Sequence, residues 1–136
     1  MSSFRIFDIA GSAMSAQSVR LSTVASNLAN ADSVTSTPEA AFHAHMPVFK
    51  ASAAISGNAQ TPGVQVMGIE QSNAPAQKRF EPGNPLADSE GYVYAPDVNT
   101  VEQMVDMISS SRSYQSSVDV MNTAKDLALK TLSLGS

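Results

Sequence analysis

The fold is decided by residues 4–31, FRIFDIAGSAMSAQSVRLSTVASNLANA. Apolar residues recur there in alternating steps of three and four, and seven of the eight positions in the series are apolar: Phe7, Ala10, Met14, Gln17, Leu21, Val24, Leu28 and Ala31. Such stepping is typical of a helix that pairs with another helix along a narrow stripe. The pattern predicts a helix over residues 4–31, about 42 Å long at 1.5 Å per residue.

The same stepping returns near the other end of the chain. Asn99 is a favourable helix N-cap and Glu102 stands at the third helical position, so a helix is expected to begin at residue 100. Gly135 suits the C-terminal stop, which gives a second helix of about 52 Å. Its stripe is formed by Met104, Met107, Ser111, Tyr114, Val118, Met121, Lys125, Ala128 and Leu132, broadened by Val101, Val105, Ile108, Val120, Leu127 and Leu134.

The segment between these helices contains all seven prolines, which excludes a continuous helix there. Residues 63–69 and 91–95 have the composition of short strands, and both strands can belong to one small sheet. Residues 81–90 consist of turn-forming residues, and residues 50–62 are expected to be mobile. We therefore predict a mainly α fold with a small β part. It comprises an N-terminal helix (1–32), an irregular or β middle segment (33–98) and a C-terminal helix (99–136), together one structural unit.

Composition excludes several classes of function. A net charge of −4 with scattered basic residues argues against nucleic-acid binding, and the absence of cysteine excludes disulfides and thiolate metal sites. No stretch is apolar and long enough for a membrane span, and the N-terminus lacks the apolar run of a cleaved secretory signal. We expect no membrane insertion and no cofactor.

The candidate chemical sites favour structural explanations. His43 and His45 stand two residues apart, but no third metal ligand is evident, so solvated histidines are the preferred interpretation. Asp88 and Glu90 lie in the turn-rich loop, where acidic residues usually serve the turn. No serine lies in a nucleophile motif, so no catalytic residue is predicted and the chain is not expected to be an enzyme.

Two narrow stripes rich in Ala and Met bury little surface when they pair with each other alone, so further partners are expected. The helices can pair within one chain or between chains. The residues predicted to form the helix-pairing and assembly seam are Phe7, Met14, Leu21, Val24, Leu28, Met104, Met107, Ile108, Tyr114, Val118, Met121 and Leu132.

Both ends resemble the signatures of flagellar rod and hook proteins. The N-terminal resemblance centres on RL (20–21) and VASNLAN (24–30), and the C-terminal one on NTVEQMVDMISSSRSYQ (99–115) followed by NTAKD (122–126). The middle motif EPGNPLADSEGYVY (81–94) is similar to that of proximal rod proteins. Residues that carry the signature are Arg20, Asn27, Asn30, Asn99, Glu102, Arg112 and Asn122; those that the resemblance marks as a candidate intersubunit loop are Pro82, Gly83, Asp88, Gly91 and Tyr92.

The resemblance covers residues 4–35 and 62–135, and it implies a structural subunit of the basal-body drive shaft. Such a subunit polymerises with copies of itself and with other rod proteins. It also contacts two further partners: adaptor proteins on the MS-ring side of the basal body, and the flagellar export apparatus. Export without a cleaved signal and assembly in the periplasmic space are further implications. The alternative from another class is a soluble helical adaptor or chaperone that binds one partner helix.

Overall fold

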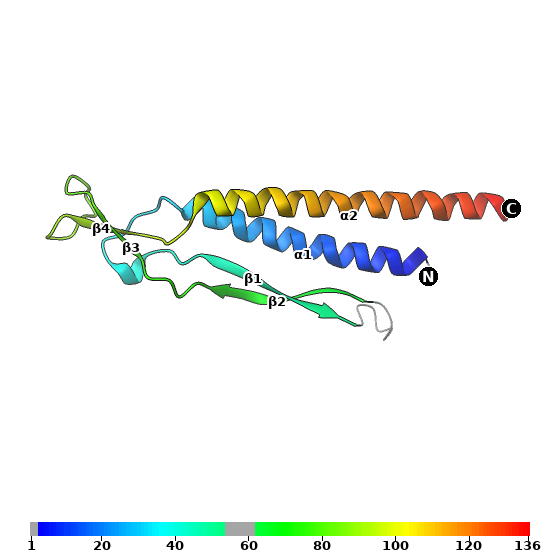
Figure 1. The fold of residues 1–136 in the computed structure, drawn as a ribbon, viewed down its shortest axis with the longest axis horizontal. Helices are drawn as coiled ribbons and strands as arrows, with labels where there is room; N and C mark the ends of the chain where they lie inside the picture. Colours follow the sequence, from blue (N-terminus) through cyan, green and yellow to red (C-terminus); the bar gives the residue numbers. More distant parts are fainter. Residues whose placement is uncertain (1–2, 54–61) are drawn as a thin grey trace. The chain divides into compact units, whose positions relative to one another are not determined.

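A computed structural model describes residues 3–53 and 62–136 and has two long helices with short strands between them (Figure 1). In chain order the elements are helix α1 (Ser3–Asn30), a 3-10 turn η1 (Pro38–Ala40), strands β1 (His45–Ser52), β2 (Gly63–Gln71), β3 (Gln77–Phe80) and β4 (Tyr92–Ala95), and helix α2 (Thr100–Leu134). The predicted fold class, mainly α with a small β part, is confirmed.

The ends of α2 follow from local chemistry. Asn99 Oδ1 accepts hydrogen bonds from the backbone N–H groups of Val101 (3.1 Å) and Glu102 (3.2 Å), which satisfies donors that a helix start otherwise leaves unpaired. At the other end, the N–H of Gly135 bonds to the carbonyl of Thr131 at 3.2 Å. The predicted start and stop of this helix are therefore those observed.

The strands form two separate two-stranded sheets, β1–β2 and β3–β4. The strands expected at residues 63–69 and 91–95 exist as β2 and β4, but the expectation that they share one sheet is wrong. Each pairs instead with a strand that the sequence pattern does not reveal. β1 contains Pro47 within the segment expected to be irregular or β, and β3 is only four residues long and mostly polar. The mobility expected for residues 50–62 falls mainly on residues 54–61, which lie outside the described residues.

Contacts between residues divide the chain into two compact units. The first comprises residues 1–21, 47–68 and 108–136. Within it, the beginning of α1 lies beside the second half of α2, and the β1–β2 hairpin is joined to α1 by a hydrogen bond from the N–H of Val64 to Ser12 Oγ (3.2 Å). The buried apolar residues of this unit are Ala10, Ala16 and Ala124. Small side chains let these elements approach closely, but they bury little apolar surface.

The second unit comprises residues 22–46 and 69–107 and contains the end of α1, the start of α2 and the β3–β4 sheet. Its buried apolar residues are Val24, Ala31, Ala41, Val93 and Ala95. In β4, buried Val93 and Ala95 alternate with half-buried Tyr92 and Tyr94, as expected for a strand with one covered face. Both units therefore have thin cores. Whether they behave as one structural unit stays a prediction.

Candidate assembly surface

The predicted seam on α1 is partly covered. Val24 is buried, and Phe7, Met14, Leu21 and Leu28 are half-buried. A second buried set, which seam stepping does not identify, consists of Ala16, Thr23 and Asn27. These three residues are small or polar, so hydrophobic periodicity gives no signal for them. Asn27 was singled out only by the resemblance.

The side chain of Asn27 joins three segments of the second unit and is only 1% exposed. Its Nδ2 donates to the backbone carbonyl of His45 (2.9 Å) and to Gln103 Oε1 (3.0 Å). Its Oδ1 accepts from the backbone N–H of His45 (2.8 Å). The end of α1, the start of β1 and the first turn of α2 are therefore held together by one amide.

The predicted seam on α2 divides into covered and exposed residues. Met107, Tyr114, Val118 and Met121 are half-buried, and the same side of the helix carries buried Ser110 and Ala124. Three other members of the predicted seam are mainly exposed: Met104 (54%), Ile108 (56%) and Leu132 (72%). At Met104 and Ile108 the covered face is rotated by about one position relative to the apolar stripe, since Gln103 and Ser110 are covered in their place. Leu132 lies in the last turns of α2, where residues 129–136 are all exposed.

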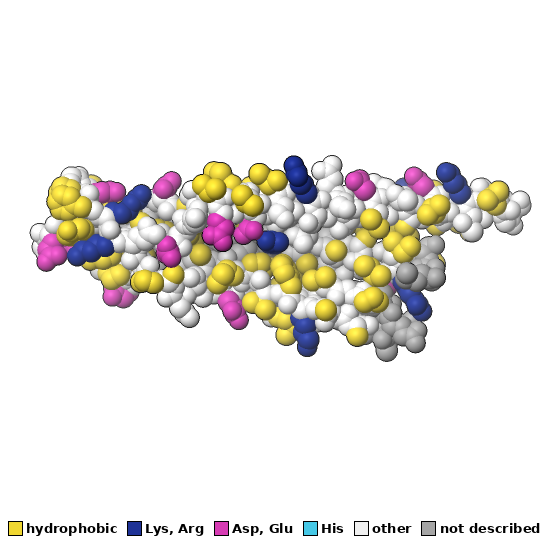
Figure 2. All heavy atoms as spheres, in the orientation of Figure 1, with side chains coloured by type: hydrophobic (Ala, Val, Ile, Leu, Met, Phe, Trp, Pro, Cys, Tyr) yellow, Lys and Arg dark blue, Asp and Glu magenta, His cyan; other side chains and the backbone are white. Residues whose placement is uncertain are grey.

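The exposed apolar residues at the start of α2 form one stripe, which we call the α2 stripe: Val101, Met104, Val105 and Ile108. Figure 2 shows apolar side chains gathered over these first turns of the helix. Spacings of three, four and seven residues place all four on one face. Each is 54–68% exposed, although burial of a side chain of this size is worth about 1.5–3 kcal/mol.

In the first unit, open apolar grooves run between the two helices. One, of about 230 Å³, is lined from α1 by Ile6, Ile9, Ala10 and Ala13 and from α2 by Ser116, Ser117 and Val120. Another, of about 270 Å³, is lined by Phe4, Phe7, Ala128, Thr131 and Leu132. The grooves contain few polar groups and no charged side chain. They are suited to packing against apolar side chains rather than to chemistry.

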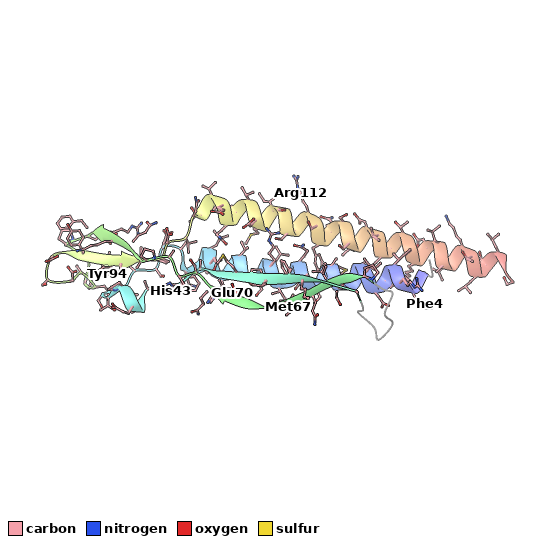
Figure 3. All side chains as sticks on the ribbon, turned by 60° about the horizontal axis from the view of Figure 1, so that its bottom comes forward. Phe4, His43, Met67, Glu70, Tyr94 and Arg112 are labelled. Carbon is pink, nitrogen blue, oxygen red and sulfur yellow. The ribbon has the colours of Figure 1, made fainter. Side chains whose placement is uncertain are left out.

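The other signature residues have separate surroundings. Asn30 Nδ2 donates to the carbonyl of Ser26 (2.9 Å), one turn back along α1, and Arg20 is half-buried. Glu102 and Asn122 are exposed on α2, and Arg112 projects from the same helix into solvent (Figure 3). The structure therefore gives internal contacts to Asn27, Asn30 and Asn99, and leaves Arg112 and Asn122 on the surface.

The candidate intersubunit loop is organised by Asp88. Its Oδ1 accepts from the N–H groups of Glu90 and Tyr92, both at 2.9 Å, and its Oδ2 accepts from the Tyr94 hydroxyl at 3.3 Å. The hydrogen bond from the Tyr92 N–H is the main cause that lowers the pKa of Asp88 below its usual value. The carboxylate therefore has a structural role within the loop. Pro82 and Gly83 are exposed at the turn.

Gly91 and Tyr92 complete this loop. Gly91 has a φ of +84°, and a Cβ at this position would lie 3.0 Å from Phe80 Cε2 and 3.1 Å from Pro82 Cβ. The Tyr92 ring contacts Phe80 edge-on at 5.2 Å, and Lys78 Nζ lies 4.1 Å from the ring centroid. Glycine is needed at residue 91 for both its conformation and the lack of a side chain.

The two histidines lie near the start of β1. The His45 ring packs against Phe42 at 5.2 Å and its Nε2 lies 3.2 Å from Gln71 Nε2, while His43 precedes the strand (Figure 3). Within residues 3–53 and 62–136, no group of three or more His, Cys, Asp or Glu side chains is arranged to hold a metal ion. No helix in the described part of the chain is long and apolar enough to cross a membrane.

Comparison with known proteins connects both helices to flagellar rod proteins. Residues 7–35 match the family described as flagella basal body rod protein, and residues 89–134 match the C-terminal family of the flagellar basal body rod FlgEFG proteins. Flagellar basal-body rod proteins FlgC from Escherichia coli O6:H1 and Salmonella typhimurium are each 53% identical to the chain over 135 residues, covering 99% of both sequences. The chain belongs to the FlgC family of flagellar basal-body rod proteins.

A more distant FlgC, from Bacillus subtilis, is 31% identical over 150 residues and again covers 99% of both sequences. FlgC relatives therefore match this chain from end to end, including the middle segment that neither family match covers. The resemblance to flagellar rod proteins, and to the proximal rod group within them, is confirmed.

Proposed function

We propose that this chain, a structural subunit of the flagellar basal-body rod, polymerises through its two terminal helices. The rod that it helps to build is a drive shaft that transmits torque and encloses the export channel. The observation that carries the proposal is the α2 stripe, four large apolar side chains left uncovered on one face of a long helix. Contact with neighbouring subunits would remove this surface from water.

The grooves between α1 and α2 supply complementary surface. The two grooves described above are apolar and open and have no charged side chain in their lining, so side chains from a neighbouring subunit can fill them without leaving charges unpaired. The alanine-rich contacts inside each unit leave much of the apolar surface of the helices free for such packing. Assembly would then supply stability that the thin cores lack.

The partners proposed are copies of this chain and other rod proteins, with adaptor proteins on the MS-ring side and the export apparatus as further contacts. We place the assembled subunit in the periplasmic space, reached by export without a cleaved signal. A structural rod family gives no reason to expect catalysis, so the chain is proposed not to be an enzyme. A helical adaptor that binds one partner helix is not favoured by the family relationship.

The α2 stripe gives a direct test, in cells whose own copy of the gene is replaced. Met104→Asp and Ile108→Asp place a charge on the stripe while the side chains replaced are more than half exposed. The free chain should therefore keep its helical content, measured by circular dichroism, whereas rod assembly and motility should be lost. The control is Ser109→Asp, which adds the same charge at an exposed polar position of the same helix.

A second pair of variants probes the covered seam. Leu28→Asp and Val118→Asp bring a charge to half-buried positions, so both the folding of the free chain and assembly should fail. The expected loss of stability is about 2–4 kcal/mol. Motile cells that carry any of the four seam and stripe variants would contradict the proposed assembly through the helices.

A further inference from the structure

The two edges of the β3–β4 sheet differ in how their backbone groups are satisfied. Along β4, Tyr94 exchanges two hydrogen bonds with Thr35, each 2.9 Å long. The N–H of Tyr92 donates to Asp88 Oδ1 (2.9 Å), and its carbonyl accepts from the N–H of Asp88 (2.8 Å). This edge is therefore closed by other parts of the same unit.

The register then defines the edge of β3. Lys78 pairs with Tyr94, and Phe80 pairs with Tyr92. In an antiparallel ladder, paired residues direct their backbone groups either toward each other or both outward. Because the groups of Tyr92 and Tyr94 point outward from β4, those of Lys78 and Phe80 must point outward from β3. The hydrogen bond from Glu81 N–H to the Gly91 carbonyl (2.9 Å) agrees with this alternation.

Nothing in the described part of the chain pairs with these outward groups, since the sheet contains β3 and β4 alone and the bridge to Thr35 lies on the β4 side. All four residues of β3 are exposed, and Phe80 is 63% exposed. The edge thus presents two N–H and two carbonyl groups beside a large apolar side chain.

Proteins often protect such an edge with a lysine that stands over it. Here Lys78 is turned across the face of the sheet, with its Nζ 4.1 Å from the Tyr92 ring centroid and 3.6 Å from Glu90 Oε2. Arg79 makes no ion pair with any carboxylate among residues 3–53 and 62–136. The open edge therefore carries a basic group that has no acidic partner in the part of the chain that the structure describes.

We propose that the edge of β3 binds an extended acidic segment of a neighbouring rod subunit, which adds as a further strand. The inference rests on the proposed rod function, because it takes the partner from the assembled rod. Backbone hydrogen bonds to Lys78 and Phe80 would hold the segment. A carboxylate beside Arg79 and an apolar side chain beside Phe80 would set its register, because side chains of neighbouring strands meet on the same face.

A matched pair of variants separates the backbone from the side chain of Lys78. Lys78→Pro removes the outward N–H without touching the inward bonds of Arg79, whereas Lys78→Ala keeps the N–H. Both remove the same charge and the contact with Tyr92. In cells that carry each variant as the sole copy, complete rods should be about tenfold fewer with Pro than with Ala. This is the expected effect of losing about one hydrogen bond to the added strand, together with the steric effect of the proline ring. Protection of the Val93 amide in the free chain verifies that β3 and β4 remain paired.

Two outcomes would overturn the inference. In the first, both variants form as many rods as the parent chain. In the second, both lose rods to the same extent, which would assign the effect to the Lys78 charge. The second measurement uses a photo-crosslinking residue in place of Phe80 in assembled rods. The expected adduct is an extended segment of a rod subunit that contains Asp or Glu. A helical segment, a protein outside the rod, or no adduct would contradict it. If the Met104→Asp variant blocks assembly while Lys78→Pro does not, only the inference about this edge fails.

Discussion

The side chain of Asn27 pairs with both backbone polar groups of His45, donating to its carbonyl at 2.9 Å and accepting from its N–H at 2.8 Å. An amide can serve a strand backbone in this way because it carries a donor and an acceptor on one planar group. The second hydrogen of Nδ2 reaches Gln103 Oε1 at 3.0 Å. In the second unit, the start of β1 is therefore tied to both helices through one side chain.

Asn27→Ala should destabilise the free chain by about 2–4 kcal/mol, because three hydrogen bonds are lost and their partners are left unsatisfied in a covered position. Urea unfolding followed by circular dichroism measures the change. Asn122→Ala, at an exposed position of α2, is the control and should be within about 0.5 kcal/mol of the parent. An equal effect of the two substitutions would show that the Asn27 contacts contribute nothing.

Asn99→Ala should remove the N-cap of α2 and cost about 1 kcal/mol. The N–H groups of Val101 and Glu102 would lose their acceptor, so amide exchange should accelerate in the first turn of the helix and not in its centre. Asn99→Asp keeps an oxygen at the same place and should preserve the protection. Unchanged exchange in the alanine variant would exclude a capping role.

The loop around Asp88 should open in acid. The pKa of this carboxyl is lower in the folded chain than its ordinary value of 3.8, so its contribution to stability is present above that value and is lost as the pH falls through the folded pKa. Exchange of the Tyr92 amide should therefore be slow at neutral pH and accelerate below about pH 3.8, relative to the intrinsic rate.

Asp88→Ala should abolish this pH dependence, with fast exchange throughout. Glu90→Gln is the control, because the Glu90 side chain is 71% exposed and makes only a surface ion pair with Lys78. A pH dependence that persists without the Asp88 carboxylate would assign the transition to another group.

Gly91→Ala should destabilise the β3–β4 unit by at least about 1–2 kcal/mol, the cost of a left-handed conformation for a residue with a Cβ. Contacts of 3.0 Å with Phe80 and 3.1 Å with Pro82 add to this cost. Gly83→Ala is a matched control in the same loop, since a Cβ there meets nothing within 4 Å. Equal unfolding midpoints for the two variants would refute the requirement for glycine at residue 91.

The long helices could be predicted from sequence because their signals are local. The three-four stepping from Phe7 to Leu28, the N-cap at Asn99 and the stop at Gly135 act within one or two turns of chain. The turn-rich loop was predictable for the same reason, since Pro82 restricts the conformation of its own backbone and Gly83 widens it. None of these features requires knowledge of a distant residue.

The strand partners could not be predicted in this way. β1 contains Pro47 and β3 is short and polar, so neither has the alternation that identifies β2 and β4. Both strands exist because another segment offers backbone hydrogen bonds, and the choice of that segment depends on how the chain folds back. A partner strand is a property of the tertiary structure rather than of the strand's own residues.

The sequence by itself determined that this chain has two long helices with apolar stripes and that it resembles flagellar rod proteins at both ends. Only the tertiary structure decided which residues of α2 are covered: Ser110 and Ala124 are buried, while Met104 and Ile108 stay exposed. The physical reason is that periodicity defines a face to within about one residue, whereas close packing selects the small side chains that let two backbones approach. The surface left exposed is the one that we propose the rod buries.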